Sequence, residues 1–225
     1  MPIYMTFVMG PKESYFFNTP THWAWHNLPP EIEALFTTPP PPTDVLELAL
    51  GDAGAYFMTY RDASTNTILC KHYNLPNPLT EYLYHGNPHV IRDLATLSVS
   101  LGPYESYYAH DKNSASWANL PAGLEKAVLG RLVSQDAGKT EWREGGGEAP
   151  SFGLYLFPHH PTSYILLLTT GKAFSNLPEH TWEDYNKISP RLPQLRQSNA
   201  PIPCIPILPP TPQPGSQSTL PLQQP

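Results

Sequence analysis

Short runs in which apolar and polar residues alternate recur along the chain up to about residue 188. Residues 46–50 (Leu-Glu-Leu-Ala-Leu) and 97–101 (Leu-Ser-Val-Ser-Leu) are two clear examples. Such runs favour β-strands, because successive side chains of a strand point to opposite faces. A Gly-Asp or Gly-Pro turn and an aromatic-rich run follow these two, so the pattern predicts strands joined in order by turns.

The tripeptide Asn-Leu-Pro occurs four times, and each copy follows a tyrosine at a nearly fixed distance. The asparagine lies 12 residues after the tyrosine in three copies and 18 residues after it in the second. The tripeptides begin at Asn27, Asn74, Asn119 and Asn176, and the tyrosines are Tyr15, Tyr56, Tyr107 and Tyr164. This periodicity predicts four structural repeats, at about 3–43, 44–93, 94–149 and 150–188.

Each tripeptide is followed by a segment that favours a short helix. Proline suits the first helical turn, where its missing N–H costs nothing. Acidic residues suit the same turn because of the helix dipole, and the four segments carry Glu31, Glu81, Glu125 and Glu183. Each repeat is therefore predicted to hold three strands and a helix. Such a unit is too small to bury its apolar face without neighbours.

Three segments depart from the regular repeat. Residues 62–67 are a polar insertion in the second repeat and predict a longer hairpin loop. The fourth repeat has two extra residues near His159-His160-Pro161. Residues 135–150 contain three consecutive glycines and predict a flexible surface excursion before the fourth repeat.

Four such units fit either a closed ring of blades or a stack with open sheet edges. An open edge invites pairing with other chains, so the closed ring is favoured. We therefore expect a mainly β fold with short helices. In it, four β-β-β-helix repeats form a closed four-bladed, propeller-like ring over residues 3–188, and a disordered Pro-rich tail follows at 189–225.

The order of elements resembles the hemopexin-like four-bladed β-propeller. That family also has four repeats of strands closed by a short helix, with aromatic patterns similar to residues 14–17 and 23–25. The resemblance implies a propeller with a possible structural cation at its centre. The chain departs from the family in lacking the cysteine pair that joins first and last blades. An Asp opens the inner strand only in the second and third repeats, at Asp44 and Asp93. The units also resemble aromatic and Leu-Pro repeats of uncharacterised fungal proteins.

Charge and cysteine usage limit the partners and the compartment. The net charge is −6 and no basic cluster is present, which argues against a nucleic-acid partner. Cys70 falls in a repeat and Cys204 in the tail, so no disulfide is expected and a reducing compartment fits. No signal peptide or membrane-spanning run is evident, so we expect a cytoplasmic or nuclear protein without a membrane partner.

The tail from about residue 190 is dominated by proline, which excludes a regular helix and a central strand. Residues 209–212 (Pro-Pro-Thr-Pro) contain a PxxP, the pattern that docks in aromatic grooves of other proteins. PxxP is common in any Pro-rich stretch, and no arginine lies close beside this one. An inert tail is therefore the favoured interpretation.

Candidate catalytic and metal-binding groups are few. His85 and His89 are four residues apart, as on one face of a helix, and are the candidate metal pair. The intervening proline breaks such a helix, so loop residues are the favoured interpretation. His110 and Asp111 could form an acid–base pair, and Cys70 suggests a buried thiol rather than a nucleophile. The sequence contains no familiar catalytic motif, so we expect no enzyme activity and no cofactor beyond the possible cation.

Aromatic residues are the other candidate functional groups. The four repeated tyrosines, with the equivalent positions Trp25, His72, Trp117 and Phe174, either wedge one repeat against the next or form repeated ligand pockets. The wedge is the favoured interpretation because these residues recur with the strand signals. Non-repeating aromatics are better candidates for a ligand-binding surface: Tyr4, Tyr60, Tyr84, Tyr104 and Trp142.

These observations favour a non-enzymatic repeat scaffold that binds a protein or peptide partner through loops on a rigid frame. Two alternatives stay open. One is a small-ligand or carbohydrate binder with several equivalent aromatic pockets. The other is a metal-dependent or acid–base enzyme that uses clustered His and Asp residues.

Overall fold

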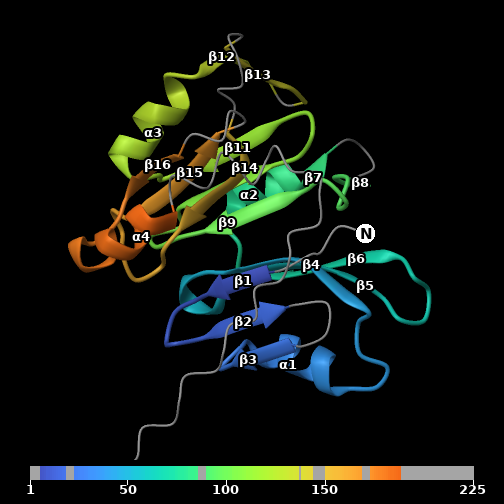
Figure 1. Ribbon diagram of the computed structural model, residues 1–225. Helices are drawn as coiled ribbons and strands as arrows, with labels where there is room; N and C mark the ends of the chain where they lie inside the picture. Colours follow the sequence, from blue (N-terminus) through green and yellow to red (C-terminus); the bar gives the residue numbers. More distant parts are fainter. Residues whose placement is uncertain are drawn as a thin grey trace, which may run out of the picture.

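The computed structural model of the protein describes residues 6–18, 23–85, 90–136, 138–143, 150–168 and 173–188. Small antiparallel sheets dominate this part of the chain, with short helices between them (Figure 1). The prediction of a mainly β fold with short helices is therefore confirmed. The Pro-rich tail lies outside the described residues.

Each of the four repeats contains a three-stranded antiparallel sheet followed by a helix, in the predicted order. The first two repeats contain β1 (Thr6–Met9), β2 (Tyr15–Asn18), β3 (Trp23–His26) and α1 (Pro30–Thr37), then β4 (Asp44–Leu50), β5 (Tyr56–Arg61), β6 (Ile68–Tyr73) and α2 (Asn77–Leu83). The last two contain β9 (Ser98–Leu101), β10 (Tyr107–His110), β11 (Ala115–Ala118) and α3 (Ala122–Leu129), then β14 (Pro150–Leu156), β15 (Tyr164–Leu168), β16 (Ala173–Asn176) and α4 (Trp182–Ile188). In every one of these sheets the middle strand of the repeat is the central strand.

Two hairpins and two 3₁₀ turns are added to this plan in the described ranges. The turns are η1 (Asp52–Gly54) and η2 (Glu179–Thr181), and the hairpins pair β7 (Tyr84–His85) with β8 (Val90–Ile91) and β12 (Leu132–Gln135) with β13 (Thr140–Trp142). The prediction of a flexible excursion over residues 135–150 is therefore wrong for the described residues up to Arg143, which belong to or adjoin the second hairpin. This hairpin is anchored on the third repeat, where the Ala115 N–H donates to Thr140 Oγ1 at 2.9 Å and Gln135 Nε2 donates to the Ala115 carbonyl at 2.8 Å.

The Asn-Leu-Pro tripeptide forms the corner between the third strand and the helix. Asn27, Asn74 and Asn119 adopt positive φ angles of 50°, 48° and 52°, a conformation that asparagine tolerates better than most residues. The proline of the tripeptide occupies the N-cap position of the helix in the first three repeats. The repeated tripeptide is therefore explained by backbone geometry.

The apolar core of the described residues consists of three clusters, and each is shared by two consecutive repeats. A pair of helical side chains four residues apart enters each cluster: Ile32 and Phe36, Leu79 and Leu83, and Leu124 and Val128. Four residues is close to one helical turn, so both members face the neighbouring strands. In the fourth repeat, Thr181 takes the position that Ile32, Leu79 and Leu124 occupy in the other three. Among the described side chains, the helix of this repeat contributes no buried apolar pair.

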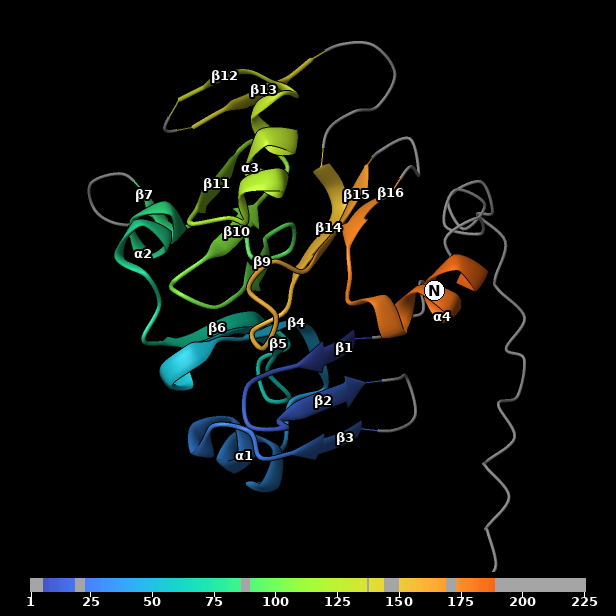
Figure 2. The ribbon, with the colours of Figure 1, turned by 90° about the vertical axis from the view of Figure 1, so that its left-hand side faces the viewer.

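The first strands of successive repeats lie side by side, β1 against β4, β4 against β9, and β9 against β14. Figure 2 shows the four sheets following one another from the first repeat at the bottom to the fourth at the upper right. Each contact brings a glycine close to the last leucine of the next first strand, with Gly10 at Leu50, Gly51 at Leu101 and Gly102 at Leu156. A Cβ added to these glycines would lie 2.6, 3.2 and 3.0 Å from the leucine Cβ.

Polar contacts also join the successive repeats. Asn18 Nδ2 donates to the Val45 carbonyl at 3.3 Å, and the Leu156 N–H donates to Ser100 Oγ at 3.1 Å. Between the second and third repeats, Glu47 accepts bonds from Ser98 and Val99.

The boundary between the fourth and first repeats differs from the other three. Phe157 replaces the glycine, and Met9 at the place of the leucine is 69% exposed. A hydrogen bond between His159 Nε2 and the Gly10 carbonyl, at 3.1 Å, joins the two repeats. No sheet within the described ranges closes on itself.

Candidate functional site

Two grooves lie at successive repeat boundaries and are built from equivalent segments. Groove A lies between the first and second repeats and has a volume of about 460 Å³. Groove B lies between the second and third repeats and measures about 330 Å³. In each, the earlier repeat contributes its Asn-Leu-Pro segment and the later repeat contributes the turn after its first strand. Residues 51–53 and Ala55 line both grooves.

The turns that form these grooves have an unusual backbone. Two consecutive residues have positive φ in each of the first three repeats: Lys12 and Glu13, Ala53 and Gly54, and Tyr104 and Glu105. Only one of these six residues is glycine, so the conformation costs free energy and needs support from the surrounding structure.

The tripeptide asparagine supplies that support. Asn27 Nδ2 donates to the Lys12 carbonyl at 2.8 Å, and Asn74 and Asn119 make the equivalent bonds to Ala53 and Tyr104 at 3.3 Å. Asn176 also donates to the corresponding turn of the fourth repeat, at 2.7 Å. The repeated sequence motif therefore holds the groove-forming turns in place.

Acidic and aromatic side chains surround the grooves. Glu31, Asp52 and Lys12 line groove A, and Asp52 and Glu105 line groove B. Tyr73 lines groove A with 58% of its surface exposed. These side chains would attract a ligand with a positive charge and a flat or apolar group.

Groove B also holds a buried hydroxyl. Ser106 lines it and is only 3% exposed, and its Oγ has no hydrogen-bond partner among the described residues. Such a group favours a bound water or a ligand atom, because a buried hydroxyl without a partner costs free energy.

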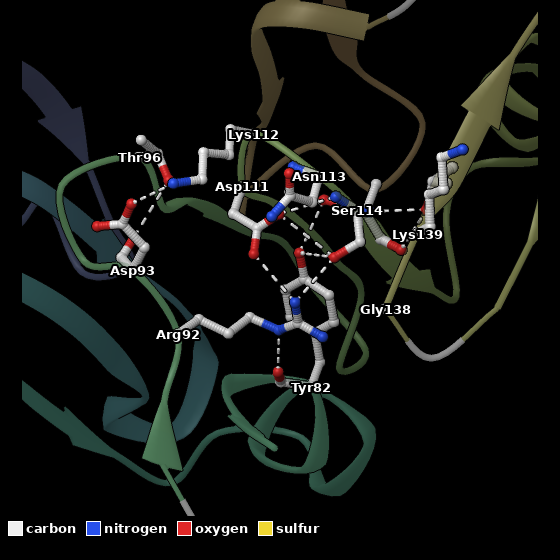
Figure 3. A network of polar contacts seen from close by, with 12 residues as sticks. Tyr82, Arg92, Asp93, Thr96, Asp111, Lys112, Asn113, Ser114, Gly138 and Lys139 are labelled. Carbon is white, nitrogen blue, oxygen red and sulfur yellow. Dashed lines mark hydrogen bonds and ion pairs between the residues drawn. The ribbon is translucent and has the colours of Figure 1, made fainter. Parts of the chain in front are cut away.

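A buried polar network lies elsewhere, between α2 and the turn after β10 (Figure 3). Arg92 Nη1 donates to Asp111 Oδ2 at 3.0 Å and to Ser114 Oγ at 2.9 Å, and both charged side chains are less than 8% exposed. The guanidinium lies over the Tyr82 ring, 3.9 Å from its centroid, and Nε donates to the Tyr82 carbonyl. The Tyr82 hydroxyl donates to the Ser114 carbonyl at 2.8 Å.

This network is interpreted as structural. Burial opposes ionisation of Asp111, but bonds from the Asn113 and Ser114 N–H groups and from Arg92 outweigh it and hold the Asp111 pKa below its usual value. Both Asp111 oxygens already accept hydrogen bonds within the protein. The carboxylate therefore fixes the turn and the Arg92 segment.

Glu47 is the most perturbed acid among the first strands. Burial raises its pKa to about 7, against the opposing effect of bonds from Val99 N–H at 3.3 Å and Ser98 Oγ at 3.2 Å. Both donors belong to β9, so Glu47 couples the second repeat to the third.

The four candidate ligand-binding aromatics lie in different environments. Tyr60 is only 6% exposed in the core shared by the first two repeats, which corrects its expected place on the surface. Tyr60 belongs to the central strand β5, which neighbouring repeats cover on both faces. The alternation of apolar and polar residues along the sequence therefore does not show which face of this strand is exposed to solvent. Tyr104 is 76% exposed in the same turn as Glu105 of groove B. Tyr84 bonds to His72 Nε2 at 2.8 Å, and Trp142 stacks on Trp117 at 6.0 Å between ring centroids. The structure does not bring these four together.

The structure does not test the candidate metal pair. His85 is in β7, and His89 lies outside the described residues. Among the described residues no group of three or more His, Cys, Asp or Glu side chains is placed to hold an ion. Asp111 forms an ion pair with Arg92, and burial lowers the pKa of His110 although the backbone and the charge of Asp111 act in the opposite direction. Burial raises the Cys70 pKa to about 12, which suits an unreactive thiol.

Two of the four repeated tyrosines, Tyr56 and Tyr107, are buried between neighbouring repeats, as expected if they wedge one repeat against the next. Tyr56 is 4% exposed in the core shared with the first repeat, and Tyr107 is 1% exposed in the core shared with the second. Tyr15 and Tyr164 are half-buried. The grooves themselves were missed by sequence reasoning, although the tripeptide and the Gly-containing turn were both visible.

Comparisons with protein-family models, with curated proteins and with solved structures found no match to this chain. Within the described ranges, no helix has the length and apolar character needed to cross a membrane. Neither result assigns a function.

Proposed function

We propose that this protein is a non-enzymatic repeat scaffold that binds a protein or peptide partner across grooves A and B. The observation that carries the proposal is the repetition of one groove geometry at two successive boundaries. Because Asp52 lines both grooves, one extended ligand could contact them together. Rigid turns held by side-chain bonds lose little entropy on binding, which favours affinity.

We also propose a propeller-like ring that is incompletely closed. Consecutive first strands lie side by side, and the His159–Gly10 bond links the last repeat to the first. Three residues support an interruption of the ring at the boundary between the fourth and first repeats. Met9 is exposed there, and Phe157 and Thr181 stand where the other repeats have glycine and leucine or isoleucine. The resemblance to hemopexin-like propellers stays a proposal on the same grounds.

The partner proposed here has basic and apolar groups on an extended backbone. Acidic side chains flank both grooves, and Tyr73 and Tyr104 add exposed aromatic surface. Opposite charges speed encounter and select partners, while the aromatic rings supply contact area.

A displayed library of random peptides, selected on the immobilised full-length chain, tests this function. We expect the selected peptides to bind the wild-type protein and to lose at least tenfold in affinity to Asp52→Lys and to Tyr73→Ser. Glu125→Lys is the matched control, because Glu125 is an exposed helical acid that lines neither groove. Equal binding by Asp52→Lys and Glu125→Lys would contradict the proposal.

A small-ligand or carbohydrate binder is the second candidate, favoured by the buried Ser106 hydroxyl in groove B. It predicts that a panel of mono- and disaccharides binds with more than one site per chain. Ser106→Ala should then weaken binding in groove B alone, which calorimetric stoichiometry would detect.

A further inference from the structure

Groove A has the chemistry of a site for a proline-rich segment. Pro11, Pro29 and Pro30 line it together with Tyr73. The Tyr73 ring stacks on Tyr56, with 6.3 Å between centroids, and Tyr56 is 4% exposed. The exposed ring is therefore held in position before any ligand arrives. Exposed aromatic rings in grooves bind polyproline II segments, which lose little entropy because proline fixes φ, and Tyr73 supplies such a ring here.

The chain carries such a segment in its own tail. Residues 201–214 read Pro-Ile-Pro-Cys-Ile-Pro-Ile-Leu-Pro-Pro-Thr-Pro-Gln-Pro and contain seven prolines. The apolar side chains between them gain from leaving water. Residues 189–225 contain no acidic residue, so the tail brings no like charge to the acids of the grooves, and its two arginines, Arg191 and Arg196, lie in the stretch that precedes residues 201–214.

The length of the chain allows this contact. The described residues end at Ile188, and the 12 residues 189–200 can span roughly 40 Å when extended. A domain of this size has a radius of gyration of about 16 Å, so a linker of this length covers a large part of its surface. Tethering gives the segment an effective concentration in the millimolar range, so even weak intrinsic affinity would fill the groove.

We infer that residues 201–214 dock in groove A, extend toward groove B and compete there with the external partner. This inference rests on the proposed function of the grooves and adds an internal occupant to it. A second copy of the chain could supply the same segment, and the test separates the two sources.

The natural cysteines give a direct test on the full-length chain. Cys204 lies within the docking segment, whereas the half-buried Cys70 has a pKa raised to about 12 by burial, so a nitroxide reagent at pH 7 should label Cys204 selectively. A Cys70→Ser chain confirms the assignment. We expect selective loss of amide peak intensity at 51–55 and 73–75, recovered when the nitroxide is reduced.

Variants and mixtures decide the outcome. Asp52→Lys and Tyr73→Ser should restore the peak intensities, and Glu125→Lys should not. Uniform loss, no loss, or loss confined to other residues would overturn the inference. Loss of intensity in an isotope-labelled chain mixed with a nitroxide-labelled but isotopically unlabelled chain would assign the contact to a second copy and also overturn it.

The failure of this inference is distinguishable from failure of the proposed function. If the nitroxide affects no groove residue but selected peptides still bind and depend on Asp52, the grooves bind partners and the tail does not dock. If the peptides also bind Asp52→Lys unchanged, both proposals fail.

Discussion

At the scale of single residues, the tripeptide asparagine has two tasks that few side chains can combine. It adopts positive φ itself, and its amide bonds to a carbonyl of a second strained turn. Proline then takes the N-cap position of the helix, and the leucine between them is buried, with Leu28 and Leu120 at 5% and 6% exposure. The repeated motif is therefore a structural device that shapes the grooves.

Replacing Asn27 by alanine and by glycine separates these two tasks. Asn27→Ala removes the bond to Lys12 and places a Cβ at positive φ, so we expect a loss of about 1–3 kcal/mol in the free energy of unfolding. Asn27→Gly removes the bond alone and should lose about 1 kcal/mol. Urea unfolding measures both. A larger loss for glycine than for alanine would contradict the proposed role of the backbone angle.

Glu47 gives a pH dependence that can be assigned to one side chain. Its pKa in the folded protein is raised from 4.5 to about 7, so the folded state holds the proton more tightly than the unfolded chain does. Its contribution to stability is therefore full below pH 4.5 and is lost as the pH rises through about 7.

Glu47→Gln keeps an acceptor for Ser98 and Val99 but cannot ionise. Between pH 5 and pH 8 we expect the free energy of unfolding of the variant to rise by roughly 1–2 kcal/mol relative to that of the wild type. This is less than the full pKa shift would give for a carboxylate completely shielded from water. Chemical unfolding across this range measures the difference. Parallel curves for the two proteins would show that Glu47 ionises normally.

At the scale of elements, contacts between neighbouring repeats hold the protein together. Each core cluster is shared by two successive repeats, and the central strands of the two inner repeats, β5 and β10, send residues to both neighbours, as Phe57 and Met58 do. Stability should therefore depend most on the contacts at the boundaries.

The glycines at the ends of the first strands test this dependence. At Gly10 an added Cβ would lie 2.5 Å from Ser14 Oγ and 2.6 Å from Leu50 Cβ, whereas at Gly51 its nearest neighbours are 3.2 Å away. Gly10→Ala should therefore lower stability by about 1–3 kcal/mol, and Gly51→Ala by less. Thermal unfolding of the two variants gives the comparison. Equal effects would show that the first boundary is no more tightly packed than the second.

The Arg92–Asp111 pair offers a second test at this scale. Asp111→Ala removes the buried carboxylate from Arg92 and should cost about 3–5 kcal/mol. Lys112→Ala breaks an exposed pair with Asp93, 3.2 Å apart, and should cost less than about 1 kcal/mol. Denaturant unfolding of both variants measures the contrast. If Asp111→Ala lowered the free energy of unfolding by less than about 1 kcal/mol, the Arg92–Asp111 network would not be a major source of stability.

At the scale of the whole molecule, the repeat order was predictable because one tripeptide marks each unit. The packing of one repeat against another was not predictable, because it depends on contacts between residues far apart in the sequence, such as Gly10 and Leu50, which are 40 residues apart. Tyr60 was misplaced for the same reason, since neighbouring repeats cover both faces of its strand. The β7–β8 hairpin was not anticipated because two-residue strands are too short to show a period.

We propose that the repeat boundaries form the binding surface of this protein. Hydrogen exchange on the full-length chain, with and without a peptide selected for binding, locates that surface. With the peptide bound, we expect slower exchange at 51–55, 73–77 and 102–106, the segments that line or adjoin grooves A and B, and little change at the 62–67 loop. Slower exchange confined to other segments, with these three unchanged, would contradict the proposal.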